Sequence, residues 1–208
     1  MPVQTKICGL TTPETLDAAL IHGTAAVGFM FYAPSPRNLA LDQGAGLAAR
    51  VPGHVRKVGV FVDPDDALID AAFEAAKLDA LQLHNTAPAR TAQLRSKAEV
   101  WATIAVRTRT DLDTAHRYAG AADRIHYDAK TDVALPGGMG VRFDWMLLDG
   151  FRHPLPWLLS GGLDAGNVGE AIRRTGAPMV DVSSGVESAP GVKDVDKIAA
   201  FLQAVAAS

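Results

Sequence analysis

The sequence lacks the features of an oxidised, membrane-bound or nucleic-acid-binding protein. Its one cysteine in 208 residues excludes an intramolecular disulfide and a thiolate metal cage. No stretch reaches the roughly 18 apolar residues that a membrane span requires. The formal net charge of −3 gives no electrostatic reason to expect nucleic acid or an acidic membrane as a partner. We therefore expect a soluble, cytoplasmic protein.

Linkers and low-complexity segments are also missing from the chain. Apolar residues make up 48% of the sequence and charged residues 21%, which is enough to build a sizeable core and argues against disorder. The length fits one large domain or two small ones, and the absence of a linker predicts a single domain that spans residues 1–208.

Short apolar runs rich in branched residues alternate with alanine-rich amphipathic segments along the chain. Eight of these runs predict strands, at residues 3–9, 25–31, 56–62, 80–84, 100–106, 123–129, 156–162 and 179–185. Capping residues predict helices that begin at Thr12-Pro13, at Asp63-Pro64-Asp65, at Asp164, which Gly176 ends, and at Asp194.

This alternation predicts an α/β fold with parallel strands and right-handed crossovers. An open doubly wound sheet and a closed (β/α)8 barrel both satisfy it. Eight repeats, with no G-x-G-x-x-G turn after the first strand, favour the closed eight-stranded parallel TIM barrel. Since each repeat has only about 26 residues, some helices should be short, above all in 107–121 and 142–151.

Polar side chains gather on one face of several predicted strands. Side chains alternate along a strand, and barrel active sites lie where the strands end. The period of two places together Gln4, Lys6 and Cys8; Gln82 and His84; Arg124, His126 and Asp128; and Asp181 and Ser183. Taken singly, His84 reads as a structural histidine and Asp128 as a loop cap. Their shared position at strand ends favours a site, because buried polar groups need partners.

Small residues follow the last two predicted strands, in SGGL (160–163) and VSSGVE (182–187). Many barrels bind a phosphate at this place, through backbone N–H groups and the N-terminus of a short helix. Paired glycines also occur in plain turns. Two such loops at the seventh and eighth strands nevertheless predict a phosphorylated ligand.

A series of motifs in order along the chain resembles the phosphoribosylanthranilate isomerase family of tryptophan biosynthesis. They are KICGLT (6–11), GFMFYAPSPR (28–37), KVGVFV (57–62), LQLH (81–84), YDAK (127–130), PGGMGVRFDW (136–145), LSGGL (159–163) and VDVSSGVESAPGVKD (180–194). The resemblance implies an Amadori rearrangement of an aminoaldose into an aminoketose, by general acid and base catalysis without metal or cofactor.

The same resemblance implies a role for each candidate residue. Cys8 is the general base, Asp128 the general acid, and Arg37 the residue that holds the anthranilate carboxylate. His84 and Asp181 lie next to the ligand. The phosphate rests on the loops that contain Gly161, Gly162, Ser183, Ser184 and Gly185.

The chemistry places two demands on these side chains. Asp128 must be protonated to open the ribose ring, so its pKa has to be raised. Cys8 must act as a thiolate, and we expect Lys6, two residues away on the same face, to supply the positive charge and to lie at the substrate site.

The chain departs from the family pattern twice, at Asn85 after LQLH and at Met139 within PGGMG. Asn85 tolerates the left-handed backbone that a glycine adopts at such a place. Met139 adds a bulky apolar group near the acid but removes no catalytic group.

Several alternatives remain open at the level of sequence. A lone cysteine is often a small buried hydrophobe, and a redox role for Cys8 has no second cysteine to resolve it. The chain could be another phosphosugar barrel enzyme, such as an epimerase or lyase, or a barrel that binds a phosphorylated metabolite without catalysis. The sequence allows both a monomer and a homodimer.

Overall fold

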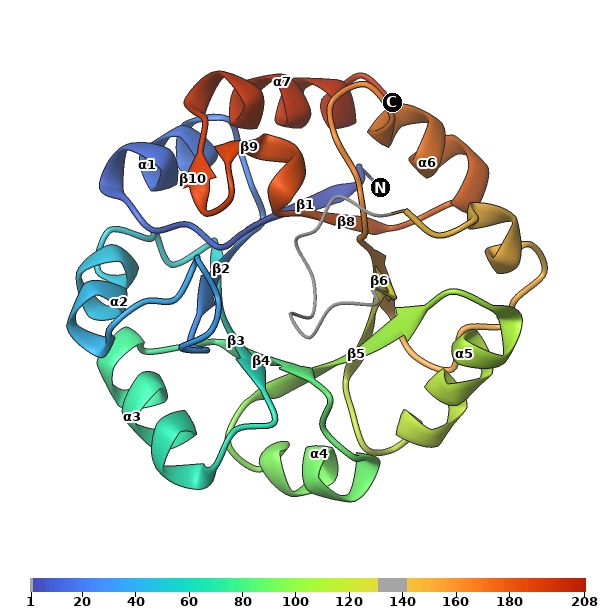
Figure 1. The fold of residues 1–208 in the computed structure, drawn as a ribbon, viewed down its shortest axis with the longest axis horizontal. Coiled ribbons are helices and arrows are strands. Elements are labelled where there is room, and N and C mark those ends of the chain that lie inside the picture. The colour runs from blue at the N-terminus through green and yellow to red at the C-terminus, as the bar shows by residue number, and fades with distance from the viewer. Residues whose placement is uncertain (1, 131–141) are drawn as a thin grey trace.

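Eight parallel strands close into a barrel, in the computed structural model that describes residues 2–130 and 142–208. The order around the barrel follows the sequence from β1 to β8, and β1 then pairs with β8 to complete the ring (Figure 1). The prediction of an eight-stranded parallel TIM barrel is confirmed. The barrel strands are Gln4–Cys8 (β1), Ala26–Met30 (β2), Arg56–Val62 (β3), Ala80–His84 (β4), Glu99–Val106 (β5), Arg124–Ala129 (β6), Trp157–Leu159 (β7) and Met179–Val182 (β8).

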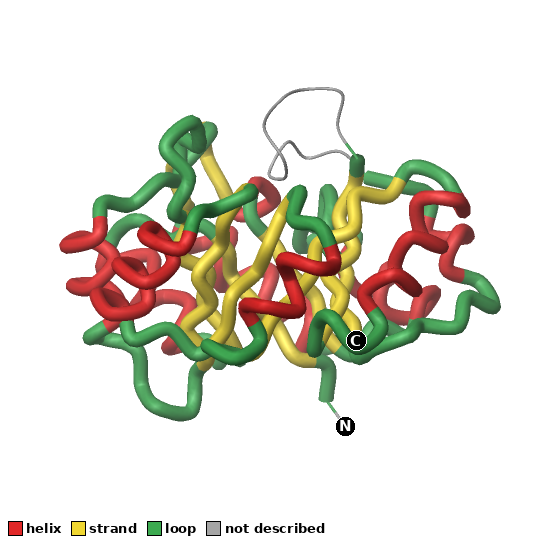
Figure 2. Tube along the Cα trace, turned by 90° about the horizontal axis from the view of Figure 1, so that it is seen from below, coloured by secondary structure: helices red, strands yellow, loops and turns green. Residues whose placement is uncertain are grey.

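Helices surround the strands as an outer ring, which Figure 2 shows from the side. They are Pro13–Ile21 (α1), Leu41–Ala48 (α2), Asp66–Ala76 (α3), Pro88–Leu94 (α4), Arg109–Asp113 (α5), Val168–Thr175 (α6) and Val195–Ala206 (α7). Three 3-10 helices, Thr114–Tyr118 (η1), Trp145–Leu148 (η2) and Ser184–Val186 (η3), and an antiparallel pair of strands, Glu187–Ala189 (β9) and Val192–Lys193 (β10), complete the described elements. None of the described helices combines the length and apolar character needed to cross a membrane.

The predicted capping residues begin three of the helices. Thr12, Asp65 and Asp194 each accept hydrogen bonds from first-turn N–H groups, of α1, α3 and α7 respectively. The prediction for α6 is wrong at its start. Asp164 N–H donates to Asn167 Oδ1 and Asp164 Oδ1 accepts from the N–H of Gly166, so 164–167 forms a turn and the helix begins at Val168. Gly176 ends α6 in the left-handed conformation, as predicted.

The repeats predicted to be weak are short. In 107–121 the chain makes one turn of α5 and then continues as η1, and in 142–151 it forms only η2. Both segments save length in a chain near the lower size limit of its fold.

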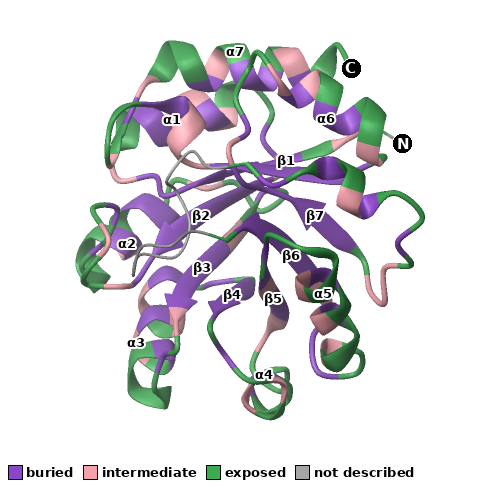
Figure 3. Ribbon diagram, turned by 45° about the vertical axis from the view of Figure 1, so that its right-hand side comes forward, coloured by how far each residue is buried: buried purple, intermediate pink, exposed green. Residues whose placement is uncertain are grey.

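The barrel interior has an apolar layer below a polar one. The apolar layer is a buried cluster formed by Ala26, Val58, Ala80, Trp101, Leu158 and Met179. Two positions further along the chain from each of these residues come, in the same order, Gly28, Val60, Gln82, Thr103, Ser160 and Asp181, of which the last four are polar. Because side chains at i and i+2 share a face, the polar groups lie on the C-terminal side of the apolar layer. Figure 3 shows that the barrel strands are mostly buried and that most exposed residues lie on the helices and loops.

Candidate active site

A chain of buried charges crosses the interior from β1 to β6. Lys6 Nζ donates to Asp181 Oδ1 at 2.9 Å, and His126 Nε2 donates to Asp181 Oδ2 at the same distance. Burial opposes ionisation of Asp181, but Lys6 and His126 outweigh it and lower the pKa of Asp181 to about 2. Asp181 therefore stays a carboxylate at the centre of the site.

Cys8 ends β1 beside this chain of charges, with 6% of its surface exposed. A Cβ added to Gly28 would lie 2.8 Å from Cys8 Sγ and 3.1 Å from Lys6 Cε, so the absent side chain of Gly28 makes room for both. Burial raises the pKa of the Cys8 thiol, and the negative charge of Asp181 adds to that effect. Lys6 acts in the expected direction, because its charge and its hydrogen bond lower the pKa of Cys8, but burial is the larger effect in the free protein.

Gly9 turns the chain away behind Cys8. Its backbone has a φ of +75°, in the left-handed region that glycine adopts without strain. A Cβ at Gly9 would lie 2.5 Å from Cδ of Arg37, so the Arg37 side chain passes directly over the turn. Cys8 and Arg37 are thereby neighbours at the barrel mouth.

Asp128 lies near the end of β6, buried to 7% exposure, and accepts a hydrogen bond from the N–H of Ala129. Burial raises the pKa of the Asp128 carboxyl, and Asp181 adds to that effect against the opposing charge of His126. The pKa of Asp128 moves in the direction that a general acid at neutral pH requires.

His84 is buried at the end of β4 and is uncharged. Burial lowers the pKa of its imidazole to about 3, and His126 and Lys6 add to the shift. Its Nε2 lies 3.1 Å from Gln82 Nε2, and because an amide nitrogen only donates, His84 Nε2 accepts. The ring therefore enters the site as a neutral group.

Arg37 does not stand alone at the mouth. Its Nε and Nη2 donate to the two carboxylate oxygens of Glu187, at 2.7 and 2.8 Å. Lys193 Nζ donates to the same carboxylate at 2.6 Å and also contacts the backbone oxygen and hydroxyl of Ser183. The three charged side chains are buried.

The two loops proposed from sequence to bind phosphate lie against each other. Gly161 and Gly162 both have positive φ after β7. A Cβ on Gly185 would lie 1.8 Å from the carbonyl oxygen of Leu163, so the loop after β8 packs on the loop after β7. Among the residues that the structure describes, no side chain caps η3, whose preceding residue is Ser183. Ser183, Ser184 and Gly185 are all half-buried.

The structure places the predicted residues at one end of one barrel. Glu187 and Lys193 were not found from sequence, since the β9–β10 hairpin that carries them follows neither strand nor helix periodicity. Asn85 has a φ of 53°, as expected for the position. Met139 lies outside the described residues. Within 2–130 and 142–208, no group of three or more His, Cys, Asp or Glu side chains is placed to hold a metal ion.

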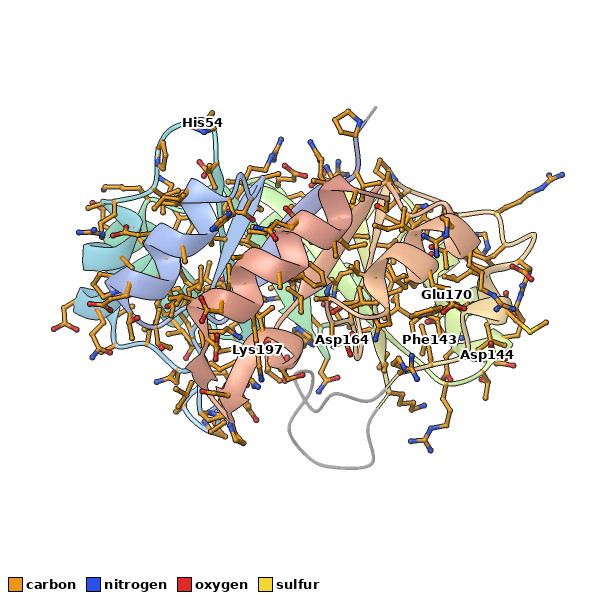
Figure 4. The ribbon with its side chains drawn as sticks, turned by 90° about the horizontal axis from the view of Figure 1, so that it is seen from above. His54, Phe143, Asp144, Asp164, Glu170 and Lys197 are labelled. Atoms are coloured by element: carbon orange, nitrogen blue, oxygen red, sulfur yellow. The ribbon has the colours of Figure 1, made fainter. Side chains whose placement is uncertain are left out.

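A separate groove of about 610 Å³ lies on the outside, between η2 and α6. Phe143, Asp144 and Glu170 in its wall come together in Figure 4, away from Lys197 and His54. The lining is mainly charged and includes none of the residues at the strand ends. The groove is therefore not part of the candidate site.

Comparisons with known proteins agree with this arrangement. A family model described as N-(5'phosphoribosyl)anthranilate (PRA) isomerase matches residues 5–204. The enzyme of that name from Zymomonas mobilis subsp. mobilis is 51% identical, with 99% of each chain covered, and the one from Paramagnetospirillum magneticum is 49% identical, with 98% and 97% covered.

Solved structures of the same family have the same fold. Phosphoribosyl anthranilate isomerase from Thermotoga maritima superimposes with a TM-score of 0.90 at 32% identity, with 99% of this chain and 100% of that chain covered. A phosphoribosyl anthranilate isomerase in complex with reduced 1-(o-carboxyphenylamino)-1-deoxyribulose 5-phosphate gives 0.88 at 31% identity and the same coverage.

Proposed function

The chain belongs to the N-(5'-phosphoribosyl)anthranilate isomerase family of tryptophan biosynthesis, and we propose that Asp128 and Cys8 are the acid and base of its reaction. The reaction converts the aminoaldose N-(5'-phosphoribosyl)anthranilate into 1-(2-carboxyphenylamino)-1-deoxyribulose 5-phosphate. The observation that carries the proposal is the placement of two buried groups with raised pKa values, Asp128 on β6 and Cys8 on β1, on either side of the Asp181 carboxylate.

Asp128 opens the ribose ring. Its carboxyl donates a proton to the ring oxygen, the C1–O bond breaks, and the lone pair of the anthranilate nitrogen forms a C1=N bond. This step leaves a positive charge on nitrogen and a carboxylate on Asp128. The raised pKa of Asp128 supports the role, because it keeps the proton on the carboxyl until substrate binds.

Cys8 then removes the proton from C2. The electron pair of the C2–H bond forms C1=C2, the nitrogen regains its lone pair, and the enolamine tautomerises to the ketone. Burial keeps Cys8 as a thiol in the free protein. Once the ring has opened, the positive nitrogen favours loss of the thiol proton to solvent water, and Lys6 adds its charge from below; the resulting thiolate takes the C2 proton.

Arg37 holds the carboxylate of the anthranilate ring. Support comes from its position over the Gly9 turn, next to the base. Binding the ring there places the carbon that loses its proton above β1. Arginine suits the role because its planar guanidinium matches a carboxylate in two parallel hydrogen bonds.

The phosphate rests on the contacting loops after β7 and β8, through Gly161, Gly162, Ser183, Ser184 and Gly185. The positive φ angles of Gly161 and Gly162, the contact between the two loops, and the start of η3, which no described side chain caps, support this assignment. We assign His84 and Asp181 to the ribose hydroxyls. Lys6, fully buried and paired with Asp181, acts on the site through its charge.

Residues 1–208 act as a single catalytic domain on a phosphorylated aminosugar, in the cytoplasm, as a monomer or a homodimer and without a cofactor, nucleic acid or a membrane. A net charge of −3 supports a partner that is a small molecule rather than a polyanion. Light scattering of the purified protein distinguishes the two oligomeric states.

The test is the loss of anthranilate fluorescence when purified protein meets freshly generated phosphoribosylanthranilate. Wild type should convert it rapidly, and Cys8→Ala and Asp128→Asn should each be slowed by at least about 10²-fold. Asp63→Asn is the matched control, since Asp63 also follows a barrel strand but is exposed, and it should retain full activity. No turnover by wild type would favour a binding protein. Activity that survives Cys8→Ala would show that Cys8 is a buried core residue and not the general base.

A further inference from the structure

Glu187 binds one edge of Arg37 from 150 positions away in the sequence. The Arg37 Nε–Glu187 Oε1 and Arg37 Nη2–Glu187 Oε2 distances are 2.7 and 2.8 Å, the parallel geometry of a bidentate pair. Two parallel hydrogen bonds fix the plane of the guanidinium as well as its distance from Glu187. Glu187 thereby determines how the Arg37 guanidinium is oriented at the barrel mouth.

The carboxylate of Glu187 is itself fixed in place. Lys193 Nζ donates to its Oε1 at 2.6 Å, and the N–H of Gly191 donates to its Oε2 at 3.2 Å. The backbone oxygen of Glu187 accepts from Lys197 Nζ at 2.7 Å. Lys197, which is labelled in Figure 4, lies at the N-terminal end of α7. The hairpin β9–β10 and the start of α7 therefore determine where the Arg37 guanidinium lies.

The three side chains form a buried triad of two cations around one anion, with 6%, 8% and 7% of Arg37, Glu187 and Lys193 exposed. Burial opposes the ionisation of Glu187, yet its hydrogen bond to Arg37 and the charge of Lys193 lower its pKa. Buried ion groups of this kind contribute little net stability compared with apolar packing. Their location suggests another purpose: Arg37 lies over Gly9 beside Cys8, and Lys193 holds Ser183 in the proposed phosphate loop.

We propose that Glu187 is a positioning residue, which orients Arg37 toward the carboxylate of the substrate, with Lys193 as the cation that holds Glu187 in place. The proposal rests on the proposed function, because it requires Arg37 to bind that carboxylate. Glu187 does not touch the substrate. Its effect is confined to ligands that carry the carboxylate, and it is lost when Arg37 is removed.

Positioning and plain charge predict opposite results for Glu187→Gln. Removing the negative charge leaves Arg37 and Lys193 less compensated, so charge alone would draw a carboxylate ligand in more strongly. Loss of the bidentate partner removes the two hydrogen bonds from Glu187 that fix the plane of the guanidinium, so the ligand is then bound by a less preorganised arginine. The positioning role therefore predicts weaker binding.

The experiment compares two inhibitors, the reduced 1-(2-carboxyphenylamino)-1-deoxyribulose 5-phosphate and the same compound without the ring carboxylate. Inhibition constants are measured for wild type, Glu187→Gln, Arg37→Gln and the double variant. We expect Glu187→Gln to weaken the carboxylated inhibitor about tenfold and to leave the other unchanged, and to add nothing in the Arg37→Gln background. Asp17→Asn is the matched control, since Asp17 forms the same bidentate pair with Arg50 on the exposed surface of α1.

Each other result has a separate meaning. Equal weakening of both inhibitors would make Glu187 structural, and tighter binding of the carboxylated one would make its effect one of charge; either overturns the proposal. Equal weakening of both inhibitors by Arg37→Gln would remove the assigned role of Arg37 as well. Wild type that binds neither inhibitor would overturn the proposed function itself. If Glu187→Gln does not fold, Glu187→Asp keeps the charge but withdraws the carboxylate, and it should weaken only the carboxylated inhibitor.

Discussion

At the scale of single residues, the site separates two proton-transfer groups by one shared carboxylate. Asp181 is held ionised by Lys6 and His126, and its negative charge disfavours the ionised forms of both Cys8 and Asp128. The same charge therefore helps to keep Asp128 protonated, and it disfavours the Cys8 thiolate until a positive group binds nearby. On this account the substrate, through its cationic nitrogen, completes the environment in which Cys8 ionises.

The reactivity of Cys8 tests this reading. Since the pKa of Cys8 is raised by burial, the free protein should react slowly with iodoacetamide at pH 7, and the rate should rise with pH later than for a free cysteine thiol. Mass spectrometry of the only thiol in the chain measures the rate without interference. Rapid alkylation that stays constant below pH 7 would show a thiolate already present in the free protein.

At the scale of elements, strand β2 makes the site possible by carrying no side chain at Gly28. An added Cβ there would lie 2.8 Å from Cys8 Sγ and 3.1 Å from the Cys8 Cα, which is a backbone atom that cannot swing aside. Strands β1 and β2 pair in register at this point, Cys8 with Gly28. Cys8 can therefore occupy its position only because residue 28 of the neighbouring strand has no side chain.

Gly28→Ala should lower kcat/KM by about tenfold or more, because the displaced sulfur no longer reaches C2 of the substrate. The fluorescence assay measures the loss, and circular dichroism checks that the barrel is intact. Gly46→Ala in α2 is the control, since nothing lies within 4 Å of its added Cβ. That variant should keep full activity and gain about 0.5–1 kcal/mol of stability. Unaltered activity of Gly28→Ala would show that the position of Cys8 is not critical.

Most elements follow from local sequence. The eight strands are branched, apolar runs, and the starts of α1, α3 and α7 follow from hydroxyl or carboxylate caps. The start of α6 could not be found in this way, because Asp164 and Asn167 are both good capping residues. The hydrogen bond from Asp164 N–H to Asn167 Oδ1, which belongs to the folded turn, distinguishes them.

At the scale of the whole molecule, closure of the barrel assembles the site. Lys6 of β1 pairs in register with Asp181 of β8, 175 positions later, where the sheet meets itself. The period of two placed both residues on the interior face, but only closure makes them an ion pair. Glu187 shows the limit of this reasoning, since its hairpin has no periodicity and its contact with Arg37 exists only in three dimensions.

Asp181→Asn should destabilise the protein by about 3–5 kcal/mol at pH 7, because it leaves the buried Lys6 ammonium without its counter-charge. The Asp181 pKa falls from about 4 in the unfolded chain to about 2 in the folded one, so its contribution is complete above about pH 4. It is lost as pH falls toward 2. Urea denaturation of both proteins across this range should show a difference that is constant near neutrality and shrinks in acid; a constant difference at every pH would contradict the account.

The division of labour between Asp128 and Cys8 is the central claim, and a kinetic isotope effect with substrate deuterated at C2 tests it most directly. Cys8→Ser should show a primary isotope effect on kcat/KM well above one, because removal of the C2 proton becomes limiting. Asp128→Asn should show an effect close to one, because ring opening then limits the rate and no C2 bond breaks in it. The reverse pattern would exchange the two roles, and equal effects in both variants would contradict the assignment of either residue to a single step.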